Sequence, residues 1–147
     1  MRDQTNSMGA VTAIVPAILA AEPAAITVDR AGYDSLTFVA QIGAGGITFT
    51  GANRIDLTME HSDDGAIWLP VVSTNVLGAT VTGSGIVLSQ RTAHPDPTTH
   101  RFGYVDGIVG QKRYVRLRAA FAGTHGTGTP IAATAILGNA RTMPVAA

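Results

Sequence analysis

The stretch NRIDLTMEHSDDGAIWLPVV, residues 53–72, decides the fold. From 53 to 61 an isoleucine, a leucine and a methionine alternate with polar residues, which is the two-residue period of a half-buried strand. The next four residues, Ser-Asp-Asp-Gly at 62–65, favour a turn, because short polar side chains bond to their own backbone and glycine accepts a positive φ. Residues 66–72 then read as a returning strand, with Pro70 at an edge or a bulge. The stretch predicts a β-hairpin.

Strand-like runs recur on both sides of this hairpin. They lie at 24–30, 34–42, in two weaker runs within 74–89, and at 102–110, 112–121 and 130–138. The segment 91–101 has two prolines and no apolar period, and is expected to be a loop. About eight short strands with regularly spaced turn signals predict an all-β fold, an antiparallel β-sandwich or barrel-like single domain.

Composition limits the functions that the chain can have. It has 147 residues, which suits one domain, and no cysteine, which excludes disulfides and thiolate chemistry. Only 14% of residues are charged and the formal net charge is zero. Such a chain has no overall field to attract nucleic acid or a membrane surface, so neither partner is expected. Without net charge to keep copies apart, a homo-oligomer is expected.

The N-terminal segment is apolar and uncharged. Residues 9–21 carry no charge, but the run is too short to span a bilayer as a helix and Pro16 interrupts it. Arg2 is balanced by Asp3, which does not favour a secretion signal. We therefore expect an extended arm over residues 1–25, followed by one β-domain over 26–147 with a short C-terminal tail. The candidate contact residues of this arm are Val11, Ile14, Val15, Ile18 and Leu19.

Charge is distributed unevenly along the chain. All ten acidic residues lie at or before Asp106, whereas five of the ten basic residues follow it, so residues 1–110 carry −5 and residues 111–147 carry +5. The basic cluster consists of Lys112, Arg113, Arg116 and Arg118, which we expect to be protein-contact residues together with those of the arm. It has three interpretations: a solvated strand face, a nucleic-acid site, which would need more stacking aromatics than this strand has, or a surface that pairs with an acidic hairpin on another copy.

No motif predicts catalysis or a bound cofactor. The pair Asp63–Asp64 precedes a glycine and is explained by turn formation, because a calcium loop spreads its acidic ligands over alternating positions. The glycines at 43–46 lack the lysine and hydroxyl residue of a phosphate loop. None of the four histidines pairs with another at zinc-motif spacing. We expect no enzyme activity, no metal and no cofactor.

Four segments, taken in order, resemble a group of small virion proteins of tailed bacteriophages. They are GYDSLTFVAQIG (32–43), IDLTMEHSDDGAIW (55–68), GYVDGIVGQKRYVRLR (103–118) and GTHGTGTPIAATAILGNARTMPV (123–145). Members of this group are capsid decoration (cement) or head-stabilising proteins. The resemblance covers roughly the last three-quarters of the chain and carries no catalytic residue with it.

The resemblance implies a function in the virion. It implies a compact β-domain on the outer surface of the capsid, made in the host cytoplasm, often trimeric, with the major capsid protein as its partner and an extended arm over capsid subunits. Two alternatives stay open: a tail or head–tail joining protein, and a carbohydrate-binding β-sandwich that aids adsorption to the host. The second would need exposed aromatic side chains, and the chain has only Trp68 and three tyrosines.

Overall fold

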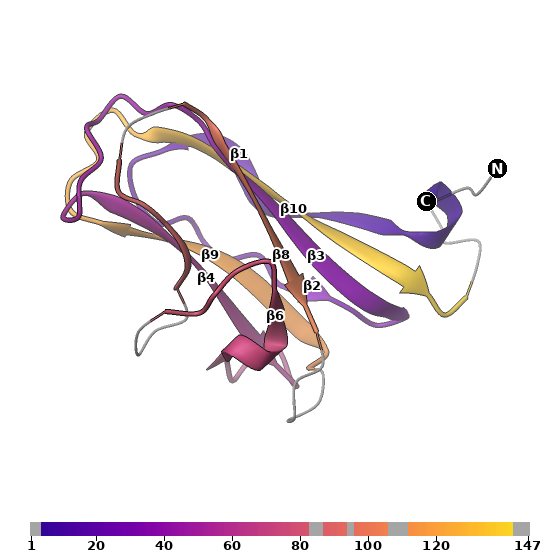
Figure 1. Ribbon diagram of the computed structural model, residues 1–147. Coiled ribbons are helices and arrows are strands. Elements are labelled where there is room, and N and C mark those ends of the chain that lie inside the picture. The colour runs from indigo at the N-terminus through magenta and orange to yellow at the C-terminus, as the bar shows by residue number, and fades with distance from the viewer. Residues whose placement is uncertain (1–3, 83–86, 94–95, 106–111, 143–147) are drawn as a thin grey trace.

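The alternating patterns form two antiparallel sheets that pack face to face, as Figure 1 shows. The computed structural model describes residues 4–82, 87–93, 96–105 and 112–142. One sheet, which we name sheet A, has the strand order β1 (Gly9–Leu19), β10 (Thr129–Ala140), β3 (Tyr33–Ile42), β8 (Thr98–Tyr104) and β6 (Val76–Leu77). The all-β sandwich predicted from the sequence is confirmed.

The second sheet, sheet B, has the order β2 (Val28–Asp29), β9 (Tyr114–Ala122), β4 (Arg54–Ser62) and β5 (Leu69–Pro70). Strand β7 (Val87–Arg91) also pairs with β4, along Ile55–Thr58. Strand β5 pairs with the end of β4, at Glu60 and His61. Two single-turn 3₁₀ helices, η1 (Thr5–Ser7) and η2 (Ser73–Asn75), precede β1 and β6.

The core lies between the inner faces of the two sheets. Phe38 of β3, Leu57 of β4 and Leu117 of β9 are fully buried, and their neighbours along each strand point outward. This is the alternation read from the sequence at 34–42, 53–61 and 112–121, so the inward faces predicted for these strands are confirmed. Burial of such side chains stabilises the domain by about 1.5–3 kcal/mol each.

The hairpin at 53–72 forms, but its second strand is shorter than predicted. Only Leu69–Pro70 is strand, paired with Glu60 and His61 at the sheet edge. The Asp64 carboxylate accepts hydrogen bonds from the backbone N–H groups of Ala66 and Ile67, and thereby extends the turn. On its other side, β4 pairs along its full length with β9.

The expected loop at 91–101 is also partly strand. Strand β7 runs to Arg91 and β8 begins at Thr98. The residues of β8 show little alternation in sequence, but β3 offers them a complete ladder of partners from Ile42 to Leu36. Tertiary pairing therefore overrides weak local preference.

The N-terminal segment, expected to be an extended arm over residues 1–25, is extended but contributes a strand to sheet A. Residues 9–19 are extended, but they form β1, which pairs antiparallel with β10 from Gly9↔Leu137 to Leu19↔Thr129. Two register shifts interrupt the ladder, which is typical of an edge strand. Gly128, at φ +81°, allows the end of β1 to approach closely, because a Cβ there would lie 2.9 Å from the Leu19 carbonyl oxygen.

Candidate functional site

The basic residues of β9 bind acidic residues of the same chain. Register pairing sets Arg116 opposite Glu60 and Arg118 opposite Thr58 on β4. Glu60 accepts from Arg116 at 2.6 Å and from Arg118 at 3.0 Å. Arg118 also binds Glu22 at 2.5 Å, and this hydrogen bond raises the pKa of the arginine.

The other two members of the basic cluster are paired as well. Arg113 binds Asp29 of β2 at 2.7 Å, and this contact raises the pKa of the arginine and lowers that of the carboxyl. Lys112 binds Asp63 in the turn after β4. The basic residues of 111–147 in this cluster therefore form ion pairs with acidic residues of 1–110 in the same molecule. This geometry argues against the nucleic-acid interpretation and against pairing of this face with another copy.

The aromatic side chains on this side are covered. The Arg116 guanidinium lies 4.1 Å from the ring centroid of Trp68, and that of Arg113 lies 4.9 Å from the ring centroid of Tyr114. Tyr104 is buried. A carbohydrate-binding surface needs a free aromatic face for the sugar, and stacked arginines occupy two of these rings.

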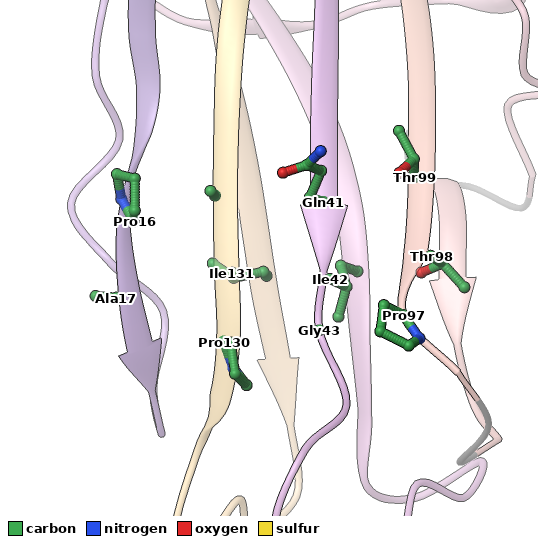
Figure 2. Close-up of a pocket in the computed structure, with 11 residues that line it drawn as sticks. Pro16, Ala17, Gln41, Ile42, Gly43, Pro97, Thr98, Thr99, Pro130 and Ile131 are labelled. Carbon is green, nitrogen blue, oxygen red and sulfur yellow. The ribbon is translucent and has the colours of Figure 1, made fainter.

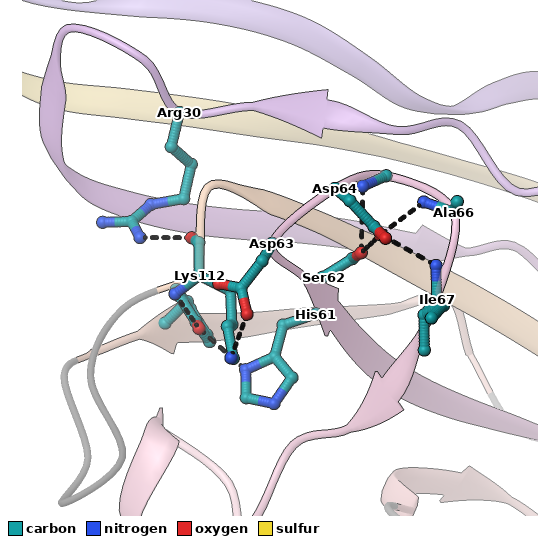
Figure 3. A network of polar contacts seen from close by, with 10 residues as sticks. Arg30, His61, Ser62, Asp63, Asp64, Ala66, Ile67 and Lys112 are labelled. Carbon is teal, nitrogen blue, oxygen red and sulfur yellow. Dashed lines mark hydrogen bonds and ion pairs between the residues drawn. The ribbon is translucent and has the colours of Figure 1, made fainter.

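The acidic turn is a structural network, drawn in Figure 3. One carboxylate oxygen of Asp64 accepts from the Ser62 hydroxyl and from the N–H groups of Ala66 and Ile67, and these bonds lower the pKa of Asp64. The turn interpretation accounts for every one of these contacts. Within the described ranges, no three histidine, cysteine, aspartate or glutamate side chains gather as a metal site would require.

The outward face of sheet A differs from that of sheet B, because across β1, β10 and β3 it carries no charge. The outward residues there are Ala10, Thr12, Ile18, Pro130, Ala132, Thr134, Ile136, Ser35, Thr37, Val39 and Gln41. Arg101 of β8 stands beside them. The core of a protein–protein interface is depleted of charged residues in the same way.

Two grooves mark this uncharged face. The larger, about 410 Å³, runs across β1, β10, β3 and β8 between Pro16, Pro130 and Pro97 (Figure 2). A smaller one, about 220 Å³, lies over β10 and β3 and shares Gln41 and Ala132 with the first. Small side chains leave the backbone close to the surface, so a partner's side chains have recesses to fill.

Exposed large apolar side chains gather at two edges. At the β1 edge, the side chains of Val15 and Ile18 are 59% and 70% exposed, and that of Val11 is 36% exposed. Of the other contact residues predicted on this segment, Ile14 is buried and Leu19 packs partly against the core. Both therefore stabilise the fold instead of offering a free surface.

The second edge was not predicted. It carries Ile67, Leu69, Val72 and Leu77, which are between 50% and 70% exposed, on and around β5, η2 and β6. In the sequence Ile67, Leu69 and Val72 read as part of the returning strand 66–72, and Leu77 as part of a weaker run within 74–89. The available signal was the unbroken apolar run from Ala66 to Val72, which has no polar alternate to mark a solvent face.

Comparison with known proteins gives one structural neighbour to report. The chain is similar to the crystal structure of the SPBc2 prophage-derived protein YomS, with a TM-score of 0.49 and 13% sequence identity, over 88% of this chain and 91% of that chain. No family model matches the sequence, and no curated protein matches it. In the described part of the chain, no helix is long and apolar enough to cross a membrane.

Proposed function

We propose that this chain is a structural virion protein of a tailed bacteriophage that binds the outer surface of the capsid. It stabilises the head by crosslinking neighbouring copies of the major capsid protein, after synthesis in the host cytoplasm. The observation that carries the proposal is the uncharged, grooved outer face of sheet A. Such a face suits burial against another protein, and many copies on one shell add weak contacts into strong attachment.

The charged outer face of sheet B also supports docking of the protein through sheet A. The cations of the basic cluster at 112–118 are neutralised by Glu60, Glu22, Asp29 and Asp63, so sheet B is suited to face solvent. Sheet A would then face the shell. The sequence resemblance to capsid decoration proteins points to the same class of partner.

Locating the protein in virions tests the proposal. Particles of the phage that encodes the chain are labelled with antibody–gold and viewed by negative-stain microscopy. Label over the whole head supports decoration. Label confined to the tail or the neck overturns it in favour of a tail or head–tail joining protein, and unlabelled particles overturn the virion function itself.

A substitution on the uncharged face tests which side binds. Thr134→Arg places a cation in the middle of the uncharged face formed by β1, β10 and β3, where Thr134 is exposed, and its desolvation opposes docking. We expect occupancy on heads that lack the protein to fall at least about tenfold. Gln90→Arg, at an exposed position of β7 in sheet B, is the matched control and should bind as the wild type does. Equal binding by the two variants would contradict this orientation.

A further inference from the structure

The exposed large apolar residues of the described chain are confined to two segments. They are Met8, Val11, Val15 and Ile18 in one, and Ile67, Leu69, Val72 and Leu77 in the other. Neither segment holds a charge, because the chain has no charged residue from Gln4 to Ala21 or from Gly65 to Gln90. Apolar patches of this kind mark sites of association.

The two segments lie at opposite edges of the molecule. Strands β1 and β6 are the two outer strands of sheet A, separated by β10, β3 and β8 (Figure 1). Strand β5 and η2 lead into β6, so the second segment borders the far edge. A surface that would bind itself about a two-fold axis needs one patch, whereas this chain has two that lie apart.

We propose that the β1 edge of one copy docks against the β5–η2–β6 edge of the next copy, head to tail. Each patch then covers the other, and no copy within a closed ring leaves an apolar edge in water. A partner of another kind at either edge would leave the second patch exposed. With a net charge of zero, copies do not repel one another as they approach.

The main chain of β1 supports the assignment. As an edge strand, β1 directs alternate N–H and C=O groups away from β10, and a long edge without lysine is a ready surface for association. Pro16 and the two register shifts interrupt this edge, so side-chain contacts of Val15 and Ile18 contribute more than a continuous ladder would. The contact is therefore sensitive to single apolar residues.

This inference deepens the proposed function by assigning the contact between copies, but its test needs only the purified chain. Sedimentation equilibrium of the wild type at about 100 µM should show an assembly larger than the monomer. Ile18→Asp and Leu77→Asp each place a carboxylate in one patch, at side chains that are 70% and 60% exposed. Each variant alone should weaken association at least about tenfold. Gln90→Asp, outside both patches, should leave it unchanged.

Mixing the two variants separates head-to-tail docking from two-fold docking. Ile18→Asp keeps an intact β5–η2–β6 edge and Leu77→Asp keeps an intact β1 edge, so the mixture should form a one-to-one heterodimer that cannot close. A monomeric wild type, a Leu77→Asp variant that still assembles alone, or a mixture without heterodimer would each overturn the proposal. None of these outcomes bears on whether the chain binds heads, which the labelling of virions decides.

Discussion

Glu60 binds two arginines at once on the outer face of sheet B. Its carboxylate accepts from Arg116 and Arg118, and its side chain is only 15% exposed. Arg116 in turn covers Trp68. One acidic residue therefore positions two cations and, through one of them, an indole ring.

Replacing Glu60 should measurably lower stability. Glu60→Gln removes the charge that both arginines face, and we expect the free energy of unfolding to fall by about 1 kcal/mol, since solvent screens part of each pair. The urea midpoint at constant slope measures this. Asp34→Asn breaks the exposed pair with Arg141, whose side chains are 54% and 67% exposed, and should change stability by less than about 0.5 kcal/mol. An equal loss in both variants would contradict the central position of Glu60.

At the scale of an element, β1 has two functions divided between its faces. Ala13 and Ile14 are buried in the core, whereas Val15 and Ile18 face solvent. The segment therefore both completes sheet A and forms one of its edges. Removal of residues 1–20 would take away a strand, so truncation cannot separate binding from folding as a free arm would have allowed.

A pair of isoleucines on β1 tests this division. Ile14→Ala empties a site in the core and should lower the free energy of unfolding by about 2–4 kcal/mol. Ile18→Ala alters a side chain that is 70% exposed and should change monomer stability by less than about 0.5 kcal/mol. Thermal or urea unfolding measures both. If Ile14→Ala is as stable as the wild type, β1 is not part of the folded domain.

Strands with strong alternation were predictable and those without it were not. Strands β3, β4 and β9 were predicted close to their true bounds, because apolar and polar residues alternate along them. Strand β10 was predicted from its run of small and apolar residues after a glycine-rich loop. In β1 the outward Ala10 and Thr12 are nearly as small and neutral as the inward residues, so no face was distinguishable. The partners of Arg116 and Arg118 depend on the register of β9 against β4, more than 50 residues away in sequence, and a single sequence does not encode that register visibly.

At the scale of the whole molecule, two histidines connect the sheets. His61 of β4 contacts the Tyr104 hydroxyl of β8 at 2.8 Å through Nδ1, and His100 of β8 contacts the Ser89 hydroxyl of β7 at 3.0 Å. The backbone N–H of Lys112 donates to Tyr104, which leaves the tyrosine proton for His61. Burial, and then the charge of Lys112, lowers the pKa of His61, although Asp63 opposes this; burial, and then Arg91, lowers that of His100.

The lowered pKa values of His61 and His100 predict a loss of stability in mild acid. Both pKa values lie below the ordinary 6.5 in the folded state, so the unfolded chain binds protons first as the pH falls. The stabilisation is complete above about pH 6.5 and is lost as the pH falls through the folded-state values. Asp29 and Asp64 have pKa values lowered from 3.8, so their contribution is lost only at lower pH.

Unfolding by urea at a series of pH values from about 7.5 to 5 measures this dependence. The free energy of unfolding of the wild type should decline across the range. The double variant His61→Gln/His100→Gln should show a shallower decline, whatever its stability at neutral pH. Parallel curves for the two proteins would assign the pH dependence to other groups.

The pairing of every cation of the basic cluster also governs how fast the protein finds its target. Each arginine of that cluster has a carboxylate within 3.0 Å, so the field outside the molecule decays over a short distance. Diffusional encounters are then unsteered, and association proceeds at about 10⁵–10⁶ M⁻¹s⁻¹ with little dependence on ionic strength. We expect the rate of assembly on a shell to be similar at low and at high ionic strength, and to depend instead on the concentration of the protein.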